Sequence, residues 1–241
     1  MNALIRCERV SLSLGGHRIL DDVSLALPAL AAIVVAGAVT SGLQVGPMFA
    51  TRALAPNAQR LAPSGGERGL RAMSTIAMTI ARLGVVGSNP VTAPVIEDSY
   101  RRALVVLSDH LANARFLLGA RPAACDFAVY GQMTQLVGVE PTSRAIAYST
   151  APRVVAWIDV MEELSGLEPG DSDWMPRDRI PATMNAVLRE VGRTYVPFLL
   201  ANAAAIAAGS KTVECSIDGK PWTQQTFPYQ AKCLGWLREE Y

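Results

Sequence analysis

Apolar side chains recur every three or four residues through most of the second half of the chain, and proline or glycine stands at the breaks. Over residues 97–113, one stripe carries Tyr100, Leu104, Leu107 and Leu111. A repeat close to the helical period of about 3.6 residues predicts an amphipathic helix that buries one face. A chain with this pattern has to fold by packing helices against one another.

The same reading predicts further helices and one hairpin. Pro152 suits the first turn of a helix, and Pro197 removes one backbone donor from a long helix and is expected to bend it. Asp218-Gly219 is a strong two-residue turn between two alternating strands. The expected elements are helices at about 124–137, 143–148, from 151–152 onward, 181–208 and 229–239, with strands at 212–217 and 220–226. The fold class is therefore mainly α, a helical bundle with a small β-hairpin near the C-terminus.

Residues 1–28 are predicted to form a separate β-hairpin that turns at Gly15-Gly16. The segment RVSLSLGGHRILDDVSLALP resembles the opening hairpin of an ABC transporter ATPase. That family continues into a phosphate-binding loop that ends in Lys and Ser or Thr. Here residues 37–42 are followed by Leu43-Gln44, which supply neither the lysine nor the magnesium-binding hydroxyl. We therefore expect no nucleotide cofactor.

The next unit, residues 29–95, is expected to contain an apolar helix, a linker and one further helix over 66–84. Residues 29–50 carry no charge and are long enough to span a bilayer, although glycines and Pro47 weaken the helix. Two interpretations stay open: a membrane helix, or an apolar helix that is buried or poorly ordered. Residues 43–75 also resemble part of a switch protein of flagellar or type III export.

Charge and cysteine content exclude several classes of function. Lys and Arg total 22 and Asp and Glu total 21, so nothing favours binding to nucleic acid. Without a CxxC pair and with two histidines, a metal site is not expected. The pattern is typical of reduced thiols in a cytoplasmic protein, with membrane association as the lesser alternative. The cysteines are Cys7, Cys125, Cys215 and Cys233, and the histidines are His17 and His110.

Residues 98–241 resemble the all-helical C-terminal domain of bacterial glutathione S-transferase family proteins. The segment RFLLGARPAACDFAVYGQM is similar to that family's loop FLLG-x-R-P-S-x-A-D-F, in which Asp stands three residues after Ser or Thr and completes a helix capping box. Asp126 matches this Asp and is interpreted as a structural cap. Ala123 replaces the hydroxyl residue, which should cost about 1 kcal/mol of helix stability and fray the helix start slightly.

The third unit, residues 96–241, is therefore expected to be a glutathione transferase C-terminal-like helical domain, and the resemblance implies that this domain lacks its catalytic partner. In that family a thioredoxin-like domain binds glutathione and lowers the pKa of its thiol, and no position in this sequence matches those residues. We therefore assign no catalytic residue and leave the glutathione-binding residues open. Glutathione is the cofactor only if the family activity is retained. The expected function is a glutathione S-transferase-like protein that is inactive or weak alone.

Two alternatives come from other functional classes. The first is a non-catalytic interaction module that binds a protein partner or a second copy of itself through exposed apolar helices. The second is a membrane-anchored protein held by residues 29–50. The aromatic residues that could line a substrate wall are better interpreted as core residues, and His110 as a partner of the helix dipole. These aromatic residues are Tyr100, Tyr130, Trp157, Tyr195, Trp222 and Trp236.

Overall fold

The computed structural model describes residues 5–14, 17–27, 85–139, 141–176 and 178–240. The apolar segment 29–50, the helix expected over 66–84 and the turn at Gly15-Gly16 lie outside the described residues. Within the described ranges, no helix is long and apolar enough to cross a membrane.

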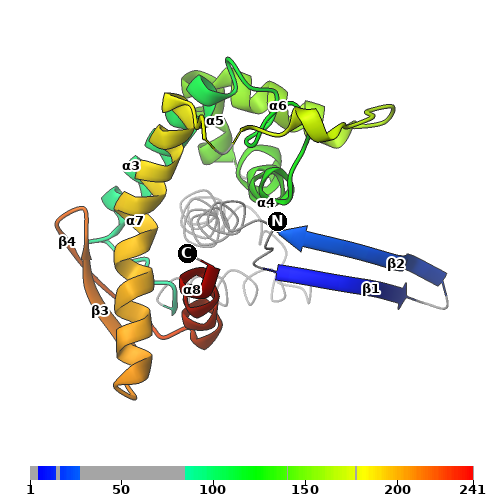
Figure 1. The fold of residues 1–241 in the computed structure, drawn as a ribbon. Coiled ribbons are helices and arrows are strands. Elements are labelled where there is room, and N and C mark those ends of the chain that lie inside the picture. Colours follow the sequence, from blue (N-terminus) through cyan, green and yellow to red (C-terminus); the bar gives the residue numbers. More distant parts are fainter. Residues whose placement is uncertain (1–4, 15–16, 28–84, 140, 177, 241) are drawn as a thin grey trace, which may run out of the picture.

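The predicted N-terminal hairpin is confirmed. Strands β1 (Ile5–Leu14) and β2 (His17–Leu27) are antiparallel (Figure 1). Their register runs from the pair Ile5 and Leu27 to the pair Leu14 and His17, with irregularities between. The two strands form a sheet of their own.

The rest of the described chain is mainly helical, as predicted, with a second small hairpin near the C-terminus. The expected elements from 124 onward are all present, with bounds that differ by a few residues. The elements are α3 (Ala93–His110), α4 (Ala124–Met133), the π-helical turn η1 (Thr134–Val139), α5 (Pro141–Thr150), α6 (Pro152–Glu162), the 3₁₀ turn η2 (Asp171–Asp173), α7 (Ala182–Ala207), β3 (Thr212–Ile217), β4 (Lys220–Gln225) and α8 (Pro228–Glu240).

Helix α3 starts earlier than predicted because two polar side chains cap its first turns. The side-chain oxygen of Asn89 accepts the amides of Val91 and Thr92 at 2.9 and 3.1 Å. In return, the Thr92 hydroxyl accepts the Asn89 amide at 2.9 Å and donates to the Gly87 carbonyl at 2.7 Å. This reciprocal pair satisfies donors that a helix start leaves free. The spacing of apolar residues does not reveal such a cap, so it does not predict this helix start.

Helix α4 ends earlier than predicted, and its continuation widens into η1. Side chains near the start of α5 donate hydrogen bonds to main-chain carbonyls of η1. The Ser143 hydroxyl donates to Leu136 O at 2.5 Å, and the Arg144 guanidinium donates to Val137 O at 2.5 Å and also to Gly138 O. With its carbonyls bound from outside, this turn does not need the regular α-helical pattern at its end.

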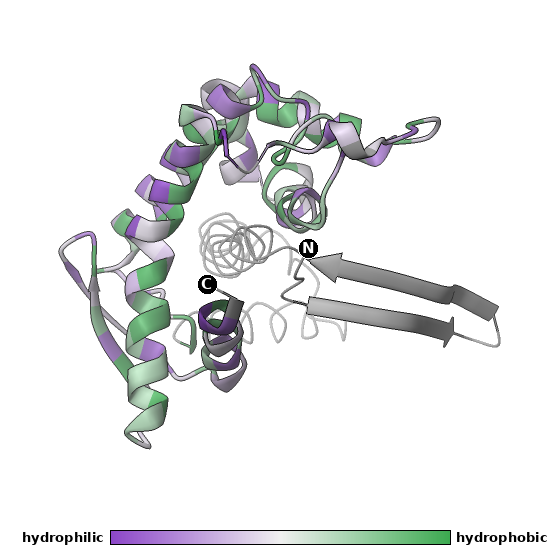
Figure 2. Ribbon diagram, viewed as in Figure 1, coloured by the Kyte–Doolittle hydropathy of each residue, from purple (hydrophilic) through white to green (hydrophobic). Residues whose placement is uncertain are grey.

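Helices α3 and α7 lie side by side, and α7 also carries the β3–β4 hairpin and α8 (Figure 1). The C-terminal half of α7 is strongly apolar (Figure 2), with Pro197 inside the helix. Burying one large apolar side chain is worth about 1.5–3 kcal/mol, so the buried side chains of these elements and of the loop that follows α3 stabilise the fold. The largest fully buried side chains are Trp222, Phe116, Phe198, Leu104, Leu117 and Met184.

Two polar contacts fix the C-terminal segment. The Asn202 side chain of α7 binds both main-chain groups of Phe227, accepting its amide at 2.8 Å and donating to its carbonyl at 2.9 Å. At the hairpin turn, Asp218 has φ of 49° and binds Arg102 of α3 at 2.9 Å and Arg193 of α7 at 2.5 Å. The turn predicted at Asp218 therefore also joins the hairpin to both long helices.

Candidate functional site

The loop between α3 and α4, residues 111–123, is held in place by several hydrogen bonds to neighbouring segments. It packs against residues 173–175: Ala120 donates to Asp173 O at 2.8 Å, and Met175 donates to Leu118 O at 2.7 Å. Gly119 allows this close approach, because it has φ of 134° and an added Cβ would lie 2.1 Å from Asp173 O. The sequence placed this loop correctly but did not show its partner segment.

Asp126 is fully buried in the first turn of α4 and binds two main-chain amides. One carboxylate oxygen accepts the Ala123 amide at 2.8 Å, which is the predicted contact with the start of the helix. The other accepts the Leu117 amide at 2.8 Å, a contact that sequence spacing did not indicate. Burial raises the pKa of Asp126 to about 6, although both hydrogen bonds favour the charged form. With both oxygens engaged, Asp126 acts here as a link between loop and helix.

Ala123 supplies only half of a capping box. It has the extended backbone of an N-cap residue, with φ of −118° and ψ of 167°, but its methyl group cannot accept a hydrogen bond. The Asp126 amide bonds the Ala123 carbonyl at 2.9 Å instead. The side-chain contact that Ser or Thr would make at this position is missing, as predicted.

His110, in the last turn of α3, is fully buried and bonded through both ring nitrogens. Nε2 lies 3.1 Å from Leu117 O, and Nδ1 lies 3.0 Å from the Thr183 hydroxyl of α7. Because a carbonyl can only accept, this network assigns the proton to Nε2, and Nδ1 accepts from Thr183. Burial lowers the pKa of His110, which favours the neutral ring. The ring makes these hydrogen bonds from the last turn of α3, the position from which a partner of the helix dipole is predicted to act.

The thiols of Cys125, Cys215 and Cys233 show no sign of activation. Burial, reinforced by the neighbouring Asp126 carboxylate, raises the pKa of Cys125. Burial also raises the pKa of Cys215 and of Cys233. A hydrogen bond with Glu162 raises the pKa of Tyr130. Reactive thiols and tyrosinates need the opposite shift, so none of these groups is prepared as a nucleophile at neutral pH.

The aromatic residues divide between core and surface. Tyr100, Trp157, Tyr195 and Trp222 are buried, which confirms their interpretation as core residues. Trp236 of α8 stays partly exposed and makes an edge contact with Tyr229, with ring centroids 6.3 Å apart.

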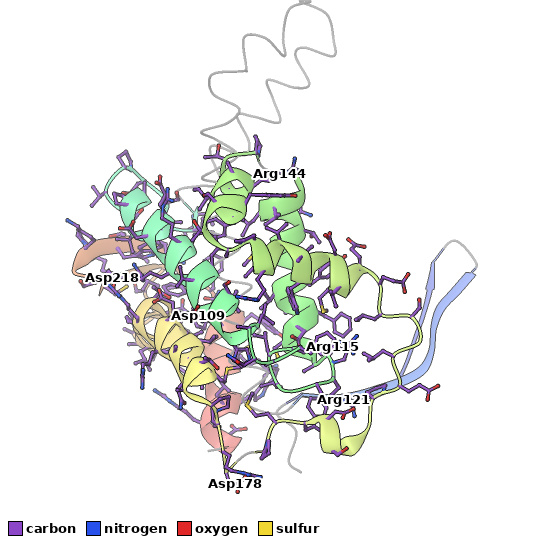
Figure 3. All side chains as sticks on the ribbon, turned by 90° about the horizontal axis from the view of Figure 1, so that it is seen from above. Asp109, Arg115, Arg121, Arg144, Asp178 and Asp218 are labelled. Carbon is purple, nitrogen blue, oxygen red and sulfur yellow. The ribbon has the colours of Figure 1, made fainter. Side chains whose placement is uncertain are left out.

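Cationic side chains gather in two places with different partners. Figure 3 shows Arg115 and Arg121 on the far side of the helices from Asp218. Arg115 lies 5.5 Å over the ring of Phe116, and Arg121 lies 4.5 Å over the ring of Trp174. Both guanidiniums cover aromatic faces at the loop. Near the hairpin, by contrast, Arg102 and Arg193 are neutralised by carboxylates.

In the part of the chain that the structure describes, no group of three or more His, Cys, Asp or Glu side chains could hold a metal ion. Comparison with protein-family models, with curated proteins and with solved structures finds no match to this chain.

Proposed function

We propose that the chain is a glutathione S-transferase-like protein whose helical part, residues 98–241, serves as a scaffold and does not itself carry out the chemistry. The observation that supports this most is the position of Asp126. The family-like loop motif is centred on this residue, and both of its carboxylate oxygens are bound by main-chain amides of the loop and helix start. This carboxylate therefore serves the architecture of the loop and helix start, which supports a structural role for the motif.

The chemistry of the described side chains favours the same function. A glutathione transferase has to stabilise a thiolate, which needs a nearby cation, a helix N-terminus or a donor with a suitable pKa. The pKa of Cys125, Cys215 and Cys233 is raised in each case. Absent or weak turnover by the isolated chain is the expected behaviour, and glutathione becomes the cofactor only if activity is found.

Chromatography and turnover test this proposal together. The full chain is passed over immobilised glutathione and assayed with glutathione and a chlorinated aromatic substrate, beside an active glutathione transferase as a positive control. We expect no retention and no turnover above the uncatalysed rate. Retention with turnover would show that the chain carries a complete active site, and the scaffold proposal would then be wrong.

An interaction module is the second candidate, and three exposed aromatic residues favour it. Phe127 of α4, Tyr148 of α5 and Tyr229 of α8 expose 50%, 59% and 66% of their surface. Exposed aromatic side chains are enriched at protein interfaces. Light scattering over a hundredfold range of concentration tests for self-association. A mass that rises with concentration in the wild type but not in Phe127→Ser would favour the interaction module. Val160→Ser, which replaces a smaller exposed apolar residue on α6, is the control and should behave like the wild type.

A further inference from the structure

His110 is a titratable side chain that is enclosed completely and has no charged partner. Within the described ranges it makes no ion pair, and its ring bonds Leu117 O and the Thr183 hydroxyl and also interacts with the main chain of Phe116. The charged or titratable groups on the segments around His110 are Asp109 on α3, Arg115 and Arg121 on the loop, Cys125 and Asp126 on α4, Arg144 and Tyr148 on α5, Arg153, Asp159 and Glu162 on α6, Asp173 on η2, Asp178 and Arg179 before α7, and Arg189, Glu190 and Arg193 on α7.

These neighbours do not compensate a charge on the imidazole. Arg115 and Arg121 would repel it, although both lie over aromatic rings. Arg153 donates to Ser108 O at 3.0 Å, in the same last turn of α3, and as a cation it would also repel a charged ring. The Asp126 carboxylate is bound to two amides, one of them that of Leu117. A buried cation without a counter-charge is costly, so the enclosed site favours the neutral ring.

We propose that His110 is an acid-sensitive latch: when its imidazole takes up a proton, the 111–123 loop and the first turn of α7 separate from the C-terminal end of α3. The neutral ring joins three segments, because it sits on α3, donates to the loop and accepts from α7. A protonated ring has two N–H donors and no acceptor, so the Thr183 hydroxyl would have to give up its donor role. Separation lets water solvate the charge.

Opening of the latch uncovers apolar surface. Phe116 and Leu117 of the loop and Met184 of α7, next to Thr183, are at most 1% exposed in the closed form. Exposing these side chains to water costs free energy. This cost limits how far protonation of His110 can shift the equilibrium from the closed to the open form. The device is therefore a local opening and leaves the packing of α7 against the β3–β4 hairpin in place.

Protonation of His110 and of Asp126 has opposite effects. The pKa of His110 is lowered in the closed form, so the open form binds more protons and acid favours opening below the ordinary pKa of about 6.5. The pKa of Asp126 is raised to about 6, so proton uptake there favours the closed form between the ordinary carboxyl range and pH 6. Removing the Asp126 carboxylate should therefore unmask the acid response.

Hydrogen–deuterium exchange of the full chain tests the latch. Peptides covering 111–123 and 182–187 are compared at pH 7.5 and 5.5, after correction for the intrinsic exchange rate. In Asp126→Asn, opening should increase by up to about tenfold for each pH unit below 6.5. The wild type should show a smaller increase. His110→Gln, which can donate to Leu117 and accept from Thr183 without titrating, should show none.

Two outcomes of the exchange experiment would contradict the latch. Equal acid responses in the wild type and His110→Gln would show that another group titrates. A flatter response in Asp126→Asn than in the wild type would assign the effect to the carboxylate. If His110→Gln does not fold, the ring ¹⁵N shifts of the wild type decide, assigned with His17→Gln since the chain has 2 histidines. A folded-state pKa of 6.5 or higher for His110 would overturn the proposal.

Discussion

Asp126 and His110 bind the two hydrogen-bonding groups of a single residue: the Asp126 carboxylate accepts the Leu117 amide, and the His110 ring donates to the Leu117 carbonyl. One peptide segment of the loop is thereby held from α4 on one side and from α3 on the other. Because all three residues are buried, neither bond can be replaced by water without opening the loop.

Loss of the Asp126 carboxylate should destabilise the fold. Asp126→Ala leaves the amides of Leu117 and Ala123 buried without acceptors, at about 1–3 kcal/mol each, partly offset by removal of a buried charge. We expect a net loss of about 2–3 kcal/mol in urea unfolding, and a smaller loss in Asp126→Asn, which keeps one acceptor. A variant within about 0.5 kcal/mol of the wild type would contradict the structural role of Asp126.

Restoring the missing half of the capping box should stabilise the chain. Ala123→Ser places a hydroxyl at a residue that already has the N-cap conformation, where it can accept the Asp126 amide. The expected gain is about 1 kcal/mol in the free energy of unfolding. Ala124→Ser is the matched control, because a serine one residue further along lies inside the helix and should bring no gain. Equal effects of the two substitutions would count against the capping geometry.

Gly119 and Gly131 should respond oppositely to alanine. At Gly119 the added methyl would lie 2.1 Å from Asp173 O on a backbone with φ of 134°, so the contact between loop and residues 173–175 must shift, at a cost of about 2 kcal/mol or more. Gly131 lies within α4 with nothing within 4 Å of an added Cβ, so alanine there should stabilise by about 0.5–1 kcal/mol. Thermal unfolding distinguishes the two, and stabilisation by Gly119→Ala would refute the close approach.

The carboxylate of Asp218 should contribute more to the stability of the chain than the ability of this residue to adopt the turn conformation. Asp218→Asn keeps a residue that tolerates positive φ but loses the charge between Arg102 and Arg193. We expect a loss of about 1–2 kcal/mol, because the pairs are only partly buried. The difference from the wild type should shrink in 1 M salt. A loss that does not change with salt would show that the charge is not the cause.

The helical order of residues 93–240 could be predicted from the sequence because each helix buries one face at a regular spacing. Asp126 as a cap was also predictable, since its partner Ala123 is three residues away. The parts that escaped prediction depend on distant contacts. Thr183, the partner of His110, is 73 residues away in sequence, and no local pattern relates them. The same holds for the carbonyl of Asp173 beside Gly119.

The early start of α3 was missed for a different physical reason. Its first turns are stabilised by Asn89 and Thr92, whose side chains bond to the main chain and add nothing to an apolar stripe. The position of His110 at a helix end indicates an interaction with the helix dipole, but it does not indicate the hydrogen bonds to Leu117 and Thr183. Burial by residues far along the chain lowers the pKa of the ring.

Calorimetric titration of the full chain with reduced glutathione tests the proposed function most directly. A scaffold domain without a thiol-activating group predicts no saturable heat up to millimolar glutathione at pH 7. A saturable isotherm with one site per chain, lost with a glutathione analogue whose thiol is methylated, would reveal a thiol-binding site and contradict the proposed function.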